Sequence, residues 1–329
     1  IMNKGLSVFG LTMLALGMVV GGSFFLGSAI AIKSAGPAVI LSYLLGGLLV
    51  YIILFSLSEM TVGDAAPGSF RTFAQRAYGP GIGFIVGWVY WTGLILAMSS
   101  EAIAVSVFMQ IWLPQISVPL LGSVIIIAIT LANLLGADKL SKLESGLAAV
   151  KLLAVAGFIV LGIALASGLF PHKVPSGLGV LADERFFPSG LKGIAGSMLI
   201  VMFTYAGFEV IGLAASETSD PHKTVPRAIT FTVLGLAGLY TAAVTLLLPL
   251  IPTAVLSDET SPMVAALMRQ GISWAADTMN IILVTAVLST MLAATFGLAR
   301  MLRSLADEGC APTWIKDKGN IPYKGILFS

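Results

Sequence analysis

The chain has 329 residues, of which 57% are hydrophobic and only 10% are charged, and its net charge is +2. A soluble domain carries roughly 25% charged residues, because water must solvate its surface. With a mean hydropathy of +0.98, the chain is therefore predicted to lie in a membrane. The balanced charge excludes a basic surface for nucleic acid, and the single cysteine, Cys310, excludes an internal disulfide and a cysteine-based zinc cluster.

Eight charge-poor runs are long enough to cross the hydrocarbon core, which needs about 20 mostly apolar residues. They lie at residues 6–32, 38–58, 81–113, 118–136, 145–169, 190–215, 228–251 and 275–299. We expect one transmembrane domain over residues 1–329. The first run is longer than the roughly 7 to 15 apolar residues of a signal-peptide core, so it is taken as span one. Residues 321–329 are similar to the approach to a ninth span, so the chain is expected to be truncated after span eight.

The distribution of Lys and Arg predicts the orientation of the chain in the membrane. If the N-terminus is cytoplasmic, the segments on that side hold twelve of the 18 Lys and Arg residues, and the opposite side holds five. The remaining residue, Lys151, lies inside a span. We therefore expect a multi-pass protein of the bacterial inner membrane with a cytoplasmic N-terminus.

Two spans carry helix-breaking residues at membrane depth. Span one contains G-M-V-V-G-G-S at residues 17–23, and each glycine destabilises a helix by about 1 kcal/mol relative to alanine. Gly17 and Gly21 also form a G-x-x-x-G pair, so close helix packing is the alternative. Span six, five helices later, contains F-T-Y-A-G-F-E at residues 203–209. Interrupted helices at corresponding positions of two repeats are typical of a transporter site.

A pair of helix breaks suits a zwitterionic substrate. Its carboxylate is expected at the free amides that begin the second half of span one, around Gly22, Ser23 and Phe24, because a helix N-terminus favours an anion. Its ammonium group is expected at the carbonyls that end the first halves, around Met18, Val19 and Phe203.

Residues 21–28, G-G-S-F-F-L-G-S, resemble the G-S/T-G-x-F-x-G-S motif of the amino acid-polyamine-organocation (APC) permeases, and especially their bacterial amino acid transporter branch. Ser23 replaces the second glycine of that motif. Residues 217–228, E-T-S-D-P-H-K-T-V-P-R-A, are similar to the family's E-x-x-x-P-x-K/R-x-I/V-P-K/R-A segment. Residues 300–312 are similar to its R-x-L-x-x-L-A-x-D/E-G-x-x-P segment. The resemblance covers essentially the whole chain.

This resemblance implies an all-α polytopic membrane protein with a LeuT-type inverted five-helix repeat, in which helices one and six are discontinuous. Two extra helices usually follow the repeats. By that measure spans nine to twelve are absent from this chain. Span ten contributes to the substrate pocket of some relatives, so one wall of the site is expected to be incomplete.

Lys151 is the one charge between Glu144 and the following outer connector. An ionisable residue at membrane depth costs about 2.5 to 3.5 kcal/mol, although a lysine stem can also snorkel to the inner surface. In the resemblance, Lys151 matches a lysine of span five that lies where sodium-coupled relatives hold sodium. We predict that Lys151 takes the place of sodium and makes transport proton-coupled. In the alternative, Ser289 and Thr290 of span eight help to hold sodium.

Two acids in spans are the other coupling candidates. Glu209 follows the break in span six and matches the acid of the family's G-x-D/E pattern, where it either relays protons or accepts hydrogen bonds from unwound backbone. Glu101 lies in the middle of span three, where the transporter branch also has an acid. It is either a coupling residue or a buried structural partner of a helix-end amide or of Lys151.

The family's pocket positions, carried over to this sequence, give an apolar substrate site without a charged wall residue. Phe203 takes the position of an aromatic gate that closes over substrate in relatives, with core packing as the alternative. The substrate-binding residues are expected to be Met18, Val19, Gly21, Gly22, Ser23, Gly93, Leu94, Met98, Phe203, Ala206, Gly207 and Ala294.

The resulting functional hypothesis is secondary active transport of a neutral amino acid by alternating access, as a proton-coupled symporter. An amino acid exchanger and a non-transporting amino acid sensor are the alternatives. The sequence has no phosphate loop, H-E-x-x-H or G-x-S-x-G motif, so an enzyme is not expected. We expect amino acid, protons and the lipid bilayer as partners, with no cofactor, metal site, nucleic acid or obligate protein partner.

Overall fold

The computed structural model describes residues 7–63, 70–134, 137–170, 176–214, 218, 220–317 and 322–329, without the side chains of residues 137–145, 213–214 and 296. Helices form its framework, and the described residues contain no β-strand. The helices are α1 (Val8–Val19), α2 (Gly22–Ala35), α3 (Val39–Gly63), α4 (Phe70–Tyr78), α5 (Pro80–Met109), α6 (Val118–Asn133), α7 (Ala137–Ser167), α8 (Val180–Asp183), α9 (Gly190–Thr204), α10 (Val210–Ala214), α11 (Pro221–Leu250), α12 (Pro262–Arg269), α13 (Ser273–Asp307) and α14 (Tyr323–Phe328).

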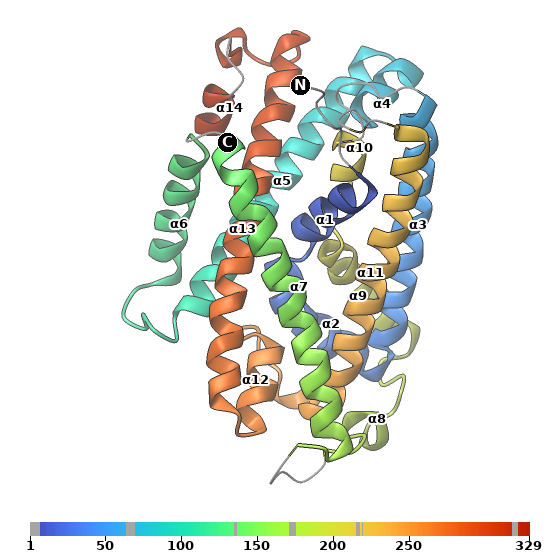
Figure 1. Ribbon diagram of the computed structural model, residues 1–329, viewed down its shortest axis with the longest axis vertical. Helices are drawn as coiled ribbons and strands as arrows, with labels where there is room; N and C mark the ends of the chain where they lie inside the picture. The colour runs from blue at the N-terminus through green and yellow to red at the C-terminus, as the bar shows by residue number, and fades with distance from the viewer. Residues whose placement is uncertain are drawn as a thin grey trace.

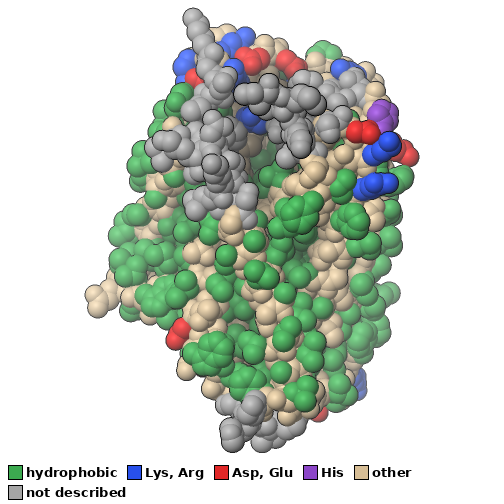
Figure 2. Space-filling model, in the orientation of Figure 1, with side chains coloured by type: hydrophobic (Ala, Val, Ile, Leu, Met, Phe, Trp, Pro, Cys, Tyr) green, Lys and Arg blue, Asp and Glu red, His purple; other side chains and the backbone are tan. Residues whose placement is uncertain are grey.

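The apolar helices of the described chain fit a membrane. Five helical segments are long and apolar enough to cross it: Gly22–Gly63, Pro80–Met109, Gly146–Ser167, Pro221–Leu250 and Ser273–Asp307. The shorter apolar helices are Val8–Val19, Val118–Asn133 and Gly190–Thr204. Figure 2 shows hydrophobic side chains over the middle of the molecule and charged side chains mainly toward its ends. The part of the chain that the structure describes is thus helical and without strands, and its apolar helices fit a polytopic membrane protein.

The two regions expected to break are interrupted. In place of one helix, expected span one contains α1 and α2, separated at Val20 and Gly21. Expected span six contains α9 and α10, separated by residues 205–209. Figure 1 shows both pairs in the interior of the molecule, among the long helices α3, α5, α7, α11 and α13. The interruptions are possible at this depth because neighbouring helices satisfy the freed backbone groups.

Small residues bring the long helices together. α3 packs against α11, and α5 packs against α13. At the first contact, a Cβ on Gly47 would lie 2.8 Å from Cβ of Ala237. At the second, a Cβ on Gly87 would lie 2.6 Å from Cδ2 of Leu305. Glycine at these crossings allows the close backbone approach that membrane helices use in place of a hydrophobic driving force.

The segment after span six is more helical than its polar sequence suggests. Spans seven and eight were expected at residues 228–251 and 275–299, but α11 already begins at Pro221 and α13 continues to Asp307. Proline is favoured at a first helical position, because its φ is already helical and its missing N–H has no helical partner to lose. Glu217 and Ser219 of the family segment lie outside the described residues, as do His172, Lys4 and Lys318.

Arg71 anchors α4 to the end of α13. Its side chain is fully buried and forms an ion pair with Glu308, while Nη1 donates to Oε1 of Gln75 at 3.2 Å. Arg71 is buried because α4 folds back onto α5, beside Gly87.

Candidate functional site

The break between α1 and α2 leaves helix-end groups in the protein interior. Val20 and Gly21 adopt extended backbone, with ψ of 94° and −166°. A Cβ on Gly22 would lie 2.8 Å from Oε2 of Glu101 and 3.0 Å from Cβ of Ala104. Glycine is therefore required at Gly22 because α5 packs directly against the start of α2.

The carboxylate of Glu101 binds the start of α2. Its Oε2 accepts a hydrogen bond from the Gly22 N–H at 2.8 Å, and its Oε1 accepts one from the Ser23 N–H at 3.1 Å. Glu101 is only 5% exposed. A carboxylate is favoured there by the helix dipole and by two unpaired amides. The amides expected to hold the substrate carboxylate are thus occupied by a side chain of α5.

The ammonium group of Lys151 binds the end of α1. Lys151 is 0% exposed, and its Nζ donates to the Gly17 carbonyl and, at 3.0 Å, to Oγ1 of Thr290. The Thr290 hydroxyl lies 3.4 Å from the carbonyl oxygen of Val20. The lysine therefore points into the helix break and does not snorkel to the surface. Ser289, the other hydroxyl considered as a sodium ligand, is also buried.

The break between α9 and α10 is held by Glu209. Gly207 has a φ of +103°, a conformation that side chains rarely adopt, and a Cβ on it would lie 3.4 Å from the Met18 carbonyl oxygen. Oε2 of Glu209 accepts a hydrogen bond from the Gly207 N–H at 3.0 Å. Glu209 thus accepts a hydrogen bond from the unwound backbone of the break. The two helix breaks also meet at Gly207 and Met18.

Sequence reasoning missed Tyr90. Its hydroxyl donates to Oε1 of Glu209 at 2.9 Å. The spacing of Tyr90 and Glu101 could have pointed to this contact. The two residues are 11 apart, which is about three helical turns, so they lie on the same face of α5. Both residues of this face contact a helix break. The Trp88 Nε1–H donates to the Cys310 carbonyl at 3.0 Å, so this indole faces protein and not lipid headgroups.

A buried aromatic cluster was also missed. Phe24 of α2 stacks on Tyr240 of α11, with ring centroids 3.9 Å apart. The Tyr240 hydroxyl donates to the Val19 carbonyl at 3.3 Å, and the Tyr205 hydroxyl donates to the Tyr43 carbonyl at 3.0 Å. All four rings are fully buried. They join both breaks to α3 and α11, and no local pattern marks them because they come from four separate segments.

The expected pocket walls fall into two groups. Val19 and Ala294 are buried and Met18 is half-buried, whereas Phe203 is 36% exposed and Gly93 and Ala206 are exposed. No atom lies within 4 Å of a Cβ placed on Gly93. Phe203 is therefore partly exposed and not fully packed in the core. Leu94 is half-buried on α5.

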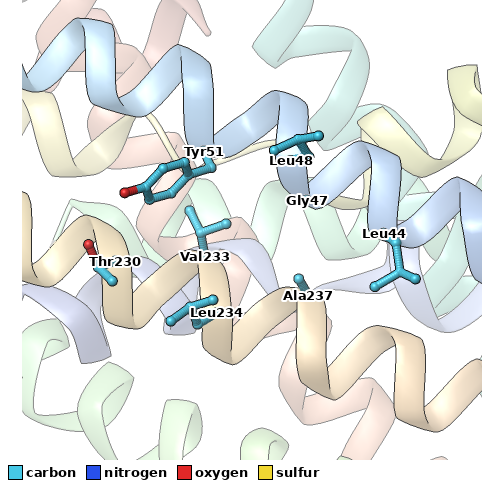
Figure 3. A pocket seen from close by; sticks show the side chains of 8 residues that line it. All are labelled: Leu44, Gly47, Leu48, Tyr51, Thr230, Val233, Leu234 and Ala237. Atoms are coloured by element: carbon cyan, nitrogen blue, oxygen red, sulfur yellow. The ribbon is translucent and has the colours of Figure 1, made fainter.

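Two cavities lie outside the breaks. Met98 lines a space of about 60 Å³ between α5, α6 and α13, together with residues that include Met291 and Thr295. A larger apolar groove, of about 350 Å³, lies between α3 and α11 (Figure 3). Figure 3 shows Tyr51 and Thr230 toward one end of this groove and Leu44 and Ala237 toward the other. None of the expected substrate or coupling residues lines the larger groove.

Comparison with known proteins shows to which family this chain belongs. The family model for amino acid permeases matches residues 10–329. The chain is 33% identical to the gamma-aminobutyric acid permease of Bacillus subtilis (strain 168), over 99% of this chain and 70% of the relative. It is 34% identical to the gamma-aminobutyric acid permease of Escherichia coli (strain K12), over 100% of this chain and 71% of the relative. It is also 32% identical to the aromatic amino acid transport protein AroP of that strain, over 100% of this chain and 72% of the relative.

These matches confirm the resemblance stated on the sequence motifs, and they identify a transporter and not an enzyme. Its substrate class is amino acids, and its location is a bacterial membrane that it crosses several times. The chain belongs to the amino acid permease family of the APC superfamily.

Proposed function

We propose that this permease carries out secondary active transport of a neutral amino acid by alternating access. The observation that carries the proposal is the meeting of the two helix breaks, where Gly207 approaches the Met18 carbonyl. Paired interrupted helices are the arrangement in which transporters bind small ions and zwitterions. In the proposed framework, spans one to five and the spans from six onward form inverted LeuT-type repeats.

The proposed substrate site lies at these breaks. The substrate ammonium group binds carbonyls near Met18, Val19 and Phe203, and its carboxylate binds the first amides of α2. The side chain lies between Met18, Met98 and Phe203, with Phe203 as the gate. Because the wall residues carry no charge, a neutral side chain is favoured over that of lysine, arginine or glutamate. The whole proposed set is Met18, Val19, Gly21, Gly22, Ser23, Gly93, Met98, Phe203, Ala206, Gly207 and Ala294.

The proposed driving ion is the proton. The Lys151 ammonium donates to Gly17 and Thr290, so a cation already lies at the hydroxyl that a sodium ion would need. An ammonium there supplies the charge that sodium provides in other transporters of this type. Glu101 and Glu209, each bonded to backbone amides at a break, are the proposed partners in coupling.

Uptake by proteoliposomes tests substrate and coupling together. The purified chain is assayed with labelled neutral, acidic and basic amino acids, with and without an inward proton gradient and with and without sodium. Accumulation of a neutral amino acid driven by the proton gradient alone is the expected result. Uptake that requires sodium would overturn the proton proposal.

Two other modes are separated by further measurements. An exchanger gives counterflow of labelled amino acid but no accumulation from empty vesicles under a proton gradient. A sensor binds amino acid without counterflow, because counterflow requires translocation. Accumulation in initially empty vesicles therefore distinguishes the proposed symporter from both alternatives.

A further inference from the structure

Two charged side chains bind the two helix ends at the break in span one. At the start of α2, Glu101 accepts hydrogen bonds from both the Gly22 and the Ser23 N–H. At the end of α1, Lys151 donates to the Gly17 carbonyl. The two side chains come from α5 and α7, and their charges are close enough to interact electrostatically. Together they present one carboxylate and one ammonium group, which are the two charged groups of an amino acid.

No amide of the first turn of α2 is left for a second carboxylate. The third amide of that turn, Phe24 N–H, donates to the Gly21 carbonyl at 3.2 Å. Gly22 also lacks room, because a Cβ there would lie 2.8 Å from Oε2 of Glu101. A backbone N–H makes one strong hydrogen bond, so the carboxylate of Glu101 and that of a ligand cannot both bind these amides fully.

We propose that Glu101 is an internal competitor of the substrate: its carboxylate holds the Gly22 and Ser23 amides in the empty transporter and leaves them when an amino acid carboxylate binds. This inference rests on the proposed function, because it concerns the same site. It makes Glu101 a positioning residue that sets substrate affinity.

Lys151 gives the displaced carboxylate a new partner. Its ammonium is buried beside the break, where it donates to the Gly17 carbonyl and to Oγ1 of Thr290. A carboxylate that moves from two amides to this ammonium keeps a charge-assisted hydrogen bond. The exchange therefore moves one side chain and breaks no covalent bond.

The test compares two ligands that differ only in the carboxylate. Equilibrium binding of labelled L-phenylalanine and of 2-phenylethylamine is measured on the purified chain in lipid nanodiscs. Glu101→Gln replaces an anion that accepts two N–H groups with a neutral amide whose single oxygen holds them less strongly. We expect Glu101→Gln to bind L-phenylalanine about five- to tenfold more tightly than wild type, without tighter binding of 2-phenylethylamine.

A second variant and a control accompany it. Glu101→Asp keeps the charge but shortens the side chain by one methylene, so it no longer reaches both amides and is also expected to bind L-phenylalanine more tightly. If Glu101→Gln does not fold, Glu101→Asp supplies the result. Glu59→Gln removes an exposed acid at the end of α3 and is expected to leave both affinities unchanged.

The outcomes separate the inference from the proposed function. If wild type binds L-phenylalanine and folded Glu101 variants bind it equally or less tightly, Glu101 is a fixed helix cap and the inference is wrong. Equal tightening for 2-phenylethylamine also overturns it, because that ligand has no carboxylate. If no neutral amino acid from a wider panel binds wild type or any variant, the proposed function is wrong. The inference that Glu101 competes with the substrate carboxylate is then wrong as well.

Discussion

The Tyr90 hydroxyl lies 2.9 Å from Oε1 of Glu209, and this hydrogen bond ties α5 to the break between α9 and α10. The other carboxylate oxygen of Glu209 holds the Gly207 N–H, which lies in the turn that meets the end of α1. Tyr90 therefore orients the acid that shapes the second break. Its ring packs edge-on against Phe70, with centroids 4.9 Å apart, which limits its own movement.

Tyr90→Phe tests this role with a minimal change. The variant keeps the ring and its contact with Phe70 but removes the hydrogen bond to Glu209, which is worth about 1.5 to 3 kcal/mol when the acceptor is charged. We expect kcat/KM for uptake to fall about tenfold, because Glu209 then has one hydrogen-bond partner fewer to hold it at the break. Tyr78→Phe, at an exposed tyrosine of α4, is the control. An unchanged kcat/KM would show that Tyr90 only packs.

Lys151→Ala removes the buried cation at the end of α1. The Gly17 carbonyl and the Thr290 hydroxyl lose their donor, and the Glu101 carboxylate loses a nearby positive charge. We expect sodium-independent uptake to be abolished, and the free energy of unfolding to fall by about 3 kcal/mol. Uptake and thermal unfolding are measured in parallel, with Lys192→Ala at an exposed lysine as control. Wild-type uptake by folded Lys151→Ala would rule out the coupling role.

Gly22→Ala introduces a methyl group where α5 leaves no space. Its Cβ would lie 2.8 Å from Oε2 of Glu101 and 3.2 Å from Cγ2 of Val287. Overpacking of this kind costs about 1 to 3 kcal/mol, so we expect the unfolding temperature to fall and uptake to be lost. Gly238→Ala is the matched control, because nothing lies within 4 Å of its Cβ, and alanine is the better helix former there. The prediction fails if both variants are equally stable.

Arg71→Met breaks the ion pair between the buried Arg71 of α4 and the partly exposed Glu308 at the end of α13. The substitution keeps the apolar stem but leaves Glu308 without its guanidinium partner. Because the Glu308 carboxylate that remains is partly exposed and solvated, we expect a loss of about 1.5 to 3 kcal/mol, the range for a hydrogen bond to a charged group. Thermal unfolding in detergent measures the change, with Arg185→Met at an exposed arginine as control. Equal unfolding temperatures would show that the pair contributes nothing.

Cys310 gives a direct test of orientation, because it is the single cysteine of the chain. It follows α13 (Ser273–Asp307), whose C-terminal end lies at the end of the molecule opposite α12 (Figure 1). With a cytoplasmic N-terminus, a membrane-impermeant maleimide is expected to label Cys310 in inside-out vesicles but not in intact cells. Ser257→Cys in a Cys310→Ala background lies in the opposite connector and is expected to give the reverse pattern. Labelling of Cys310 in intact cells would invert the proposed topology.

The sequence alone determined the membrane environment, the two interrupted helices and the ionisable residues worth explaining. These properties are local: the length of an apolar run decides whether it spans a membrane, and clustered glycines weaken a helix where they occur. The penalty for an ionisable group at membrane depth is equally local, so Lys151, Glu101 and Glu209 were found without knowledge of their neighbours.

Only the tertiary structure decided which groups these residues bind. Glu101 and Gly22 are 79 residues apart, Tyr90 and Glu209 are 119 apart, and Arg71 and Glu308 are 237 apart. No periodicity along one helix reports on such pairs, because they depend on how different helices are placed side by side. The sequence therefore showed that the first amides of α2 need an anion, and the packing of α5 against α2 decided that Glu101 provides it.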